Sequence, residues 1–116
     1  MEKAYKKLLV WKKADEFAYQ IYLKTKSFPK EEIYGITSQL RRASLSVPAN
    51  IVEGCGRQGQ KELKNFINIA LGSLMEAEYY LEFCRKLGYL KEDEFKDLEK
   101  CREGVGGLLW RFYKSL

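Results

Sequence analysis

The chain has 116 residues, enough for one domain, and its 46% hydrophobic and 32% charged residues are the balance of a folded, soluble protein. It contains no histidine, which excludes Ser-His-Asp and Cys-His catalysis and histidine metal sites, and its three cysteines form no CxxC pair. No apolar run approaches the roughly 18 residues of a membrane span, and no signal peptide follows Met1. We therefore expect a cytoplasmic protein that is not an enzyme and binds no cofactor or metal.

Positive charge is concentrated in the first half of the chain. The net charge is +5, and residues 1–61 carry 12 Lys and Arg against 6 Asp and Glu, whereas residues 62–116 carry 9 against 10. Lysine and arginine release counterions when they bind phosphates, so this asymmetry favours a polyanion as partner. The alternative is a solvated surface that only keeps the protein soluble.

Four segments repeat apolar residues at helical spacing, and none alternates as a strand would. The first, about residues 10–26, ends before Pro29 because the residue that precedes a proline leaves helical geometry. The second, about 30–54, aligns Ile33, Leu40 and Ile51 on one face and contains Pro48. Because the apolar phase continues across Pro48, we expect a kinked but continuous helix.

The third segment, about 60–87, keeps one apolar face over its whole length, about 42 Å at 1.5 Å per residue. The fourth, about 91–115, begins with three acidic residues and contains Gly104, Gly106 and Gly107, which imply close packing or a local bend. Four helices joined by short loops predict an all-α fold, an antiparallel up-and-down four-helix bundle that forms one domain over residues 1–116.

A row of polar side chains lies beside the apolar face of the second helix. We name it the polar seam; its members are Gln39, Arg42, Ser46, Asn50 and Glu53. A functional interpretation is a surface presented to a ligand or partner. A structural interpretation, which we favour, is a satisfied network in which Arg42 and Glu53 pair within the chain or between subunits.

Several basic residues are candidates for phosphate contacts. Arg41 points away from the polar seam, and Arg57, Lys61 and Lys64 surround the glycine loop at the start of the third helix, where free backbone N–H groups favour anions. Lys12 and Lys13 add to the N-terminal lysines. Tyr5 and Trp11 lie among these lysines, a weak pattern for contacts with single-stranded bases, and the interpretation we favour is that Trp11 caps the end of the bundle.

Two helices carry apolar residues outside their core faces. On the second helix these are Leu45, Ala49 and Val52, and on the third Ile69, Tyr80, Phe83 and Leu87. Grouped exposed apolar residues mark interfaces, so we expect a homo-oligomer; the alternative is burial against neighbouring helices of the same bundle.

The sequence resembles a known family. The matching runs are Leu9–Ala14, Phe28–Pro29, Glu32–Ala43, Ser46–Gly54, Gly56–Arg57 and Ala70–Glu76. They are similar to bacterial four-helix-bundle proteins encoded within intervening sequences of 23S ribosomal RNA genes. The resemblance implies a homopentameric ring and a role in RNA binding. It also implies kinship with the accessory variability determinant of diversity-generating retroelements, a basic pentamer that binds nucleic acid and a reverse transcriptase. Cys55 departs from the pattern.

Three functions follow as hypotheses. The first is a non-enzymatic, oligomeric nucleic-acid-binding protein, with RNA favoured and with phosphate contacts from Arg41, Arg57, Lys61, Lys64 and the N-terminal lysines. The second is an interaction scaffold that docks a protein such as a reverse transcriptase. The third, a magnesium-dependent nuclease using Glu92, Asp93 and Glu94, is the weakest, because the helix dipole alone explains acidic residues at a helix start.

Overall fold

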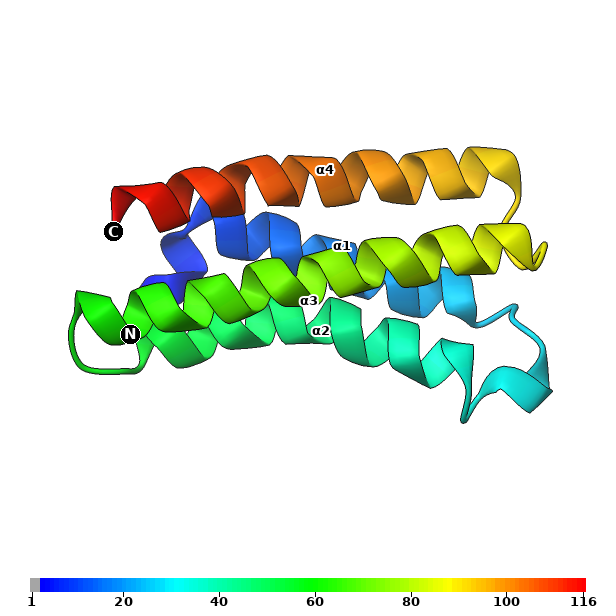
Figure 1. The fold of residues 1–116 in the computed structure, drawn as a ribbon, viewed down its shortest axis with the longest axis horizontal. Coiled ribbons are helices and arrows are strands. Elements are labelled where there is room, and N and C mark those ends of the chain that lie inside the picture. Colours follow the sequence, from blue (N-terminus) through cyan, green and yellow to red (C-terminus); the bar gives the residue numbers. More distant parts are fainter. Residues whose placement is uncertain (1–2) are drawn as a thin grey trace.

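The computed structural model describes residues 3–116, and within that range every regular element is helical. The four α-helices lie along one common direction (Figure 1), and the molecule measures 43 × 25 × 24 Å. The all-α, four-helix prediction is therefore confirmed. The elements are η1 (Ala4–Lys7), α1 (Leu9–Thr25), η2 (Lys30–Glu32), α2 (Ile36–Cys55), α3 (Gln60–Lys86) and α4 (Glu92–Ser115).

Each α-helix buries one apolar stripe toward the centre of the bundle. Phe17, Leu40, Leu81 and Leu109, one from each helix, are fully buried. Full burial of such a side chain contributes roughly 1.5–3 kcal/mol, so this core is the main source of stability. The stripe predicted for the first helix, from Val10 to Ile21, is buried along its whole length.

The prediction for the start of the second helix is wrong. Residues 30–32 form the separate 3-10 turn η2, and α2 begins only at Ile36. Gly35 (φ −110°, ψ −124°) interrupts the helical path, and the Glu32 carboxylate accepts a hydrogen bond from the Ile36 N–H at 3.4 Å. A Cβ at Gly35 would meet that carboxylate at 2.5 Å. Consequently Ile33, expected in the core, is 45% exposed.

Pro48 lies inside α2 and does not end it. The helix is continuous from Ile36 to Cys55, as the unbroken apolar phase predicted. Pro48 itself is buried, so the ring that removes one backbone donor also fills space against the rest of the bundle.

The glycines of α4 do not serve close packing, which corrects one of the two expectations for them. A Cβ built on Gly104 would meet nothing within 4 Å, and Gly106 and Gly107 would make only ordinary contacts, at 3.5 Å to Leu74 and 3.9 Å to Arg111. Close packing occurs instead at Gly54 in α2. A Cβ there would lie 2.9 Å from both Leu63 Cδ1 and Phe66 Cβ of α3.

One end of the molecule is closed by side chains from two connections. The Tyr89 hydroxyl donates a 2.8 Å hydrogen bond to Glu32, although the two residues are 57 positions apart. The Tyr89 and Phe28 rings lie 5.5 Å apart, and burial of Phe28 places this contact against the core. We call this the stapled end; it holds the α1–α2 and α3–α4 connections together.

Candidate nucleic-acid interface

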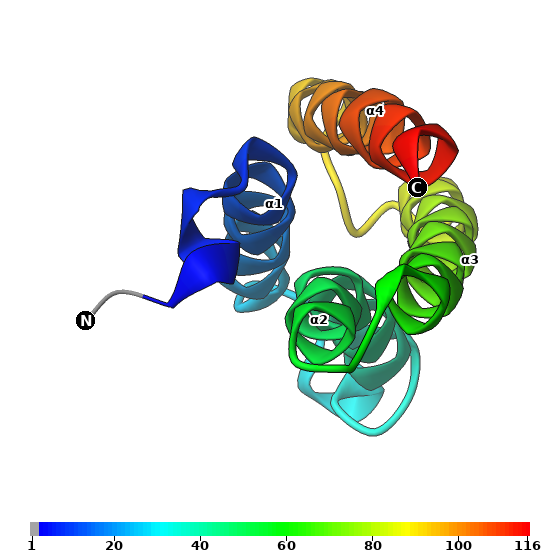
Figure 2. The ribbon, with the colours of Figure 1, turned by 90° about the vertical axis from the view of Figure 1, so that its left-hand side faces the viewer.

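The opposite end of the molecule gathers most of the positive charge. Figure 2 looks onto it: η1, the start of α1, the α2–α3 connection and the C-terminal turns of α4 meet there. Counting residues 3–7, the connection 56–59 and the six terminal residues of each helix, this end has ten basic and two acidic side chains. We call it the basic end; its cations are Lys3, Lys6, Lys7, Lys12, Lys13, Arg57, Lys61, Lys64, Arg111 and Lys114.

The stapled end is close to electrical balance. The same count there gives eight basic and seven acidic side chains. Its charges also neutralise one another directly: Arg85 forms two hydrogen bonds with Glu92, at 2.5 and 3.0 Å, and Lys24 lies 4.0 Å from Glu94. The net charge of +5 therefore lies mainly at one end of the long axis.

The three cations predicted around the glycine loop have different surroundings. Lys61 is exposed in the first turn of α3. Arg57 is half exposed, pairs with Glu53 at 3.0 Å and lies 5.1 Å over the Phe66 ring. Lys64 is half-buried, with its Nζ 4.8 Å from the centre of the Tyr113 ring in α4. Lys61 is thus the most available of the three, and the other two also hold α2, α3 and α4 together.

The start of α3 has the geometry expected of an anion-attracting helix end. Gly59 has a positive φ of 83°, which glycine adopts without strain, and no side chain caps the first backbone N–H groups. Lys61 lies beside these donors.

Arg41 does not lie with the other candidates. It is near the stapled end, where its Nε donates a 2.7 Å hydrogen bond to Thr25 Oγ1 and its guanidinium lies 4.8 Å over the Tyr22 ring. Thr25 in turn donates to the backbone of α1, to the carbonyl of Ile21 at 2.8 Å. Arg41 therefore joins α1 to α2, and it is remote from Arg57, Lys61 and Lys64 along the 20-residue length of α2.

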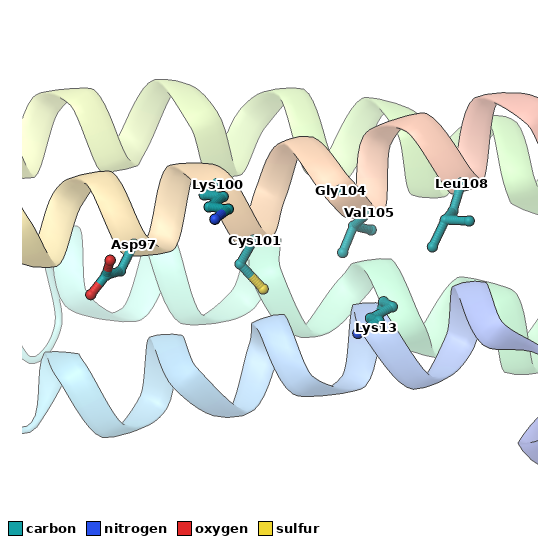
Figure 3. A pocket seen from close by; sticks show the side chains of 7 residues that line it. All are labelled: Lys13, Asp97, Lys100, Cys101, Gly104, Val105 and Leu108. Carbon is teal, nitrogen blue, oxygen red and sulfur yellow. The ribbon is translucent and has the colours of Figure 1, made fainter.

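Lys12 and Lys13 are consecutive residues of α1, and both are exposed. Figure 3 shows Lys13 beside a groove between α1 and α4, which has a volume of about 360 Å³ and is also lined by Lys100, Cys101 and Leu108. The Asp97 carboxylate lies at the same groove, so its surface is not uniformly cationic. Burial raises the pKa of the Cys101 thiol, which keeps it protonated at neutral pH.

The N-terminal turn η1 packs against α1 and α2 at the basic end. The Tyr5 and Trp11 rings meet edge to face at 5.0 Å. Between η1 and the end of α2 lies a cavity of about 230 Å³ lined by Lys3, Ala4, Tyr5, Val52, Cys55 and Gly56. We call this the Tyr5 pocket.

The polar seam lies between α2 and α3 and forms a nearly continuous network. The Arg42 guanidinium pairs with Glu76 at 2.5 Å and also donates to Gln39 at 3.3 Å. The Ser46 and Ser73 hydroxyls lie 2.8 Å apart. Asn50 Nδ2 donates to the Ser46 carbonyl and hydroxyl, both at 2.8 Å, and Glu53 pairs with Arg57. Each member of the seam has a partner within the chain, as a structural network requires, but Arg42 and Glu53 pair with Glu76 and Arg57 and not with each other.

Hydrogen bonds shift the pKa values of the charged residues at the polar seam. The Tyr80 hydroxyl donates to Glu76 at 2.8 Å, and this bond, together with the Arg42 guanidinium, lowers the pKa of the Glu76 carboxyl. The hydrogen bonds that Arg42 and Tyr80 donate to Glu76 raise the pKa of both donors. At neutral pH the Glu76 carboxylate is therefore ionised and binds the Arg42 guanidinium of α2 and the Tyr80 hydroxyl of α3.

Apolar side chains remain exposed on two faces. Leu45 is 49% exposed beside Tyr19 and Tyr22 of α1, and Ile69 and Phe83 are 51% and 40% exposed on α3. Tyr80, expected among the outward residues, is half-buried and packs against the core. Single exposed apolar residues are ordinary, but these are grouped along two helices.

Two of the three acidic residues of the nuclease hypothesis are engaged locally. Glu94 accepts a 2.9 Å hydrogen bond from the Lys91 backbone N–H at the start of α4, and Glu92 pairs with Arg85. Across residues 3–116, no cluster of three or more Cys, Asp or Glu side chains has the geometry of a metal site. No helix in the same range is long and apolar enough to cross a membrane.

Sequence reasoning missed part of the basic end. Arg111 and Lys114, in the last turns of α4, lie at the same end as Lys61, and Ser73 and Glu76 complete the polar seam from α3. A signal for the first pair was available, because an up-and-down bundle returns the end of its fourth helix to the start of its third. The partners in α3 depend on helix rotation, which spacing alone does not fix.

Comparison with known proteins supplies the family. The family described as "23S rRNA-intervening sequence protein" matches residues 6–111. A crystal structure at 1.70 Å of a protein of unknown function from the S23 ribosomal protein family of Bacteroides thetaiotaomicron is similar over 91% of this chain and 96% of that one, with 27% identity and a TM-score of 0.83. No curated protein matches the chain. With four helices in the arrangement of that structure and a family match over most of its length, this chain belongs to the 23S rRNA-intervening sequence protein family.

Proposed function

We propose that this protein is a non-enzymatic, RNA-binding homo-oligomer whose basic end contacts phosphates. The observation that carries the proposal is the convergence of ten cations on one end, from Lys3, η1, α1, the α2–α3 connection, α3 and α4, against two carboxylates. Such a surface attracts a polyanion through counterion release and does not require a pocket. The name of the family, which refers to an insertion in 23S rRNA, favours RNA over DNA.

The proposal includes an antiparallel up-and-down bundle that assembles as a ring, with five copies as the family resemblance implies. The grouped apolar side chains around Leu45 on α2 and Ile69 on α3 supply contact surface for neighbouring copies. In a closed ring every copy has the same relation to the symmetry axis. The basic ends would then face one side together, and several weak phosphate contacts would combine into strong binding.

The test is RNA binding measured against salt. Fluorescence anisotropy of a labelled structured RNA, and of single-stranded DNA for comparison, should show affinity that falls linearly with salt on logarithmic axes between about 50 and 200 mM. Native mass spectrometry of the same sample gives the number of copies in the complex. Binding that is absent, or that does not change with salt, would exclude the basic end as the functional surface.

A second candidate function is a scaffold that docks a protein such as a reverse transcriptase, as in the accessory proteins that the sequence resembles. It is favoured by the exposed Leu45, Tyr79 and Phe83 side chains, which are 40–60% exposed and more apolar than RNA binding requires. Charge reversal at Arg57 and Lys61 should leave capture of such a partner intact. Loss of capture in that variant would argue against the scaffold.

A further inference from the structure

We propose that the Tyr5 pocket binds one unpaired base of an RNA strand, with the base stacked on the Tyr5 ring. The proposal rests on the RNA-binding function above and adds the form of RNA that is recognised. The pocket lies at the basic end, between η1 and the last turn of α2. It is therefore placed where a strand held by the surrounding lysines would pass.

The size and walls of the pocket suit a single heterocyclic ring. Its volume of about 230 Å³ is below the roughly 300–1,000 Å³ of pockets that enclose whole drug-sized ligands. Val52 and Cys55 give it an apolar side, and Tyr5 gives it an aromatic one. Every base has a flat π face, so an aromatic wall accepts any base without reading its sequence.

The Tyr5 ring is held in place before a base arrives. Its edge-to-face contact with Trp11, at 5.0 Å between ring centres, ties the 3-10 turn to the first turn of α1. Trp11 is half-buried and packs against the core. A ring positioned in this way loses little conformational freedom when a base stacks on it, which favours affinity.

Charges around the pocket would hold the backbone of the same nucleotide. Lys3 lines the pocket, and Lys6 and Lys7 follow in the same short turn, all three exposed. Across the pocket, Arg57 comes directly after Gly56. A base inside a duplex is paired and stacked on its neighbours, so only a looped, bulged or single-stranded nucleotide reaches such a site.

The decisive variant is Tyr5→Ala, with Tyr34→Ala as its matched control. Tyr34 is 93% exposed in the α1–α2 connection at the stapled end and does not line the Tyr5 pocket. Loss of one base–aromatic stack should weaken binding of a short single-stranded RNA about 5- to 150-fold. The slope of affinity against salt should not change, because no charge is removed. Tyr5→Phe should bind as the wild type does, and binding of the matching RNA duplex should be unaffected by all three variants.

Trp11 offers a second, direct measurement. In a Trp110→Phe background only Trp11 reports, and single-stranded RNA should change its emission whereas the duplex should not. If the wild type binds no RNA, both the proposed function and this pocket are wrong. If it binds but Tyr5→Ala matches Tyr34→Ala, only the pocket is wrong. Equal weakening of single-stranded and duplex RNA by Tyr5→Ala would also overturn the pocket, since it would indicate a general disturbance of the basic end.

Discussion

Neutralising two cations of the basic end tests whether position, and not total charge, governs binding. Lys7 and Lys61 are exposed and form no ion pair within residues 3–116. Their double substitution by glutamine should therefore leave the fold intact. The matched control is Lys86→Gln with Lys96→Gln: both are exposed, lie at the stapled end and lower the net charge by the same amount.

The expected size of the effect follows from counterion release. Each phosphate contact contributes a slope of about 0.7–0.9 in log affinity against log salt, which corresponds to roughly 5- to 8-fold at about 0.1 M salt. Loss of two contacts should lower the slope by about 1.4–1.8 and weaken binding roughly 25- to 60-fold at that salt. The difference should disappear toward about 1 M salt.

Anisotropy titrations at four or five salt concentrations, made with both variants and the wild type, give these slopes. The stapled-end control should bind with nearly the wild-type slope, because its charges are remote from the basic end along the 43 Å axis. Equal losses in the two double variants would show that only net charge matters. That result would refute the assignment of binding to the basic end.

Three further predictions concern stability and reactivity. Gly54→Ala should lower the free energy of unfolding by about 1 kcal/mol or more, because its Cβ would lie 2.9 Å from Leu63 and Phe66, whereas Gly104→Ala, which meets nothing within 4 Å, should raise it by about 0.5–1 kcal/mol. Urea unfolding followed by circular dichroism measures both, and changes of the same sign would contradict the packing described. Glu76→Gln should lower the free energy of unfolding by about 0.5–1 kcal/mol at neutral pH. This difference should fade as the pH falls below about 4, because the Glu76 carboxyl, whose pKa is lowered in the fold, stabilises it only while it is ionised. A pH-independent difference would argue against the contacts of Glu76 with Arg42 and Tyr80. Burial raises the pKa of Cys84 to about 12 and leaves it no exposed surface, so a thiol reagent should label the half-buried Cys55 and Cys101 first. Peptide mass spectrometry gives the order of labelling, and early labelling of Cys84 would contradict its place in the core.

The helices could be predicted from the sequence because their apolar stripes are long and regular. Leu40, Val47 and Ile51 keep one phase across Pro48, and the helix is continuous as that phase predicts. The start of α2 could not be found in this way, since Ile33 fits the same phase although it is exposed. The helix begins after Gly35, where the Glu32 carboxylate accepts from the Ile36 N–H and is also bound by Tyr89, a tertiary contact that spacing along the chain does not reveal.

The sequence predicts the type of candidate site, a cluster of cations, but not all of the residues that belong to it. Arg57, Lys61 and Lys64 were recognised as neighbours because they are close in sequence. Arg41 was expected to be available for phosphate on the basis of its helix face, but its Nε is bound to Thr25 of α1. Conversely, the cavity beside Tyr5 depends on where a short 3-10 turn packs, and no periodic pattern describes such a turn. Rotation of one helix against another therefore limits what sequence alone can assign.

The bond between Tyr89 and Glu32 has a consequence for how the molecule opens. It links two connections of the chain that are 57 residues apart, so detachment of either one breaks this bond and the contact between the Phe28 and Tyr89 rings. Local unfolding at the stapled end should therefore couple the two connections, and their backbone amides should exchange hydrogen for deuterium at similar rates.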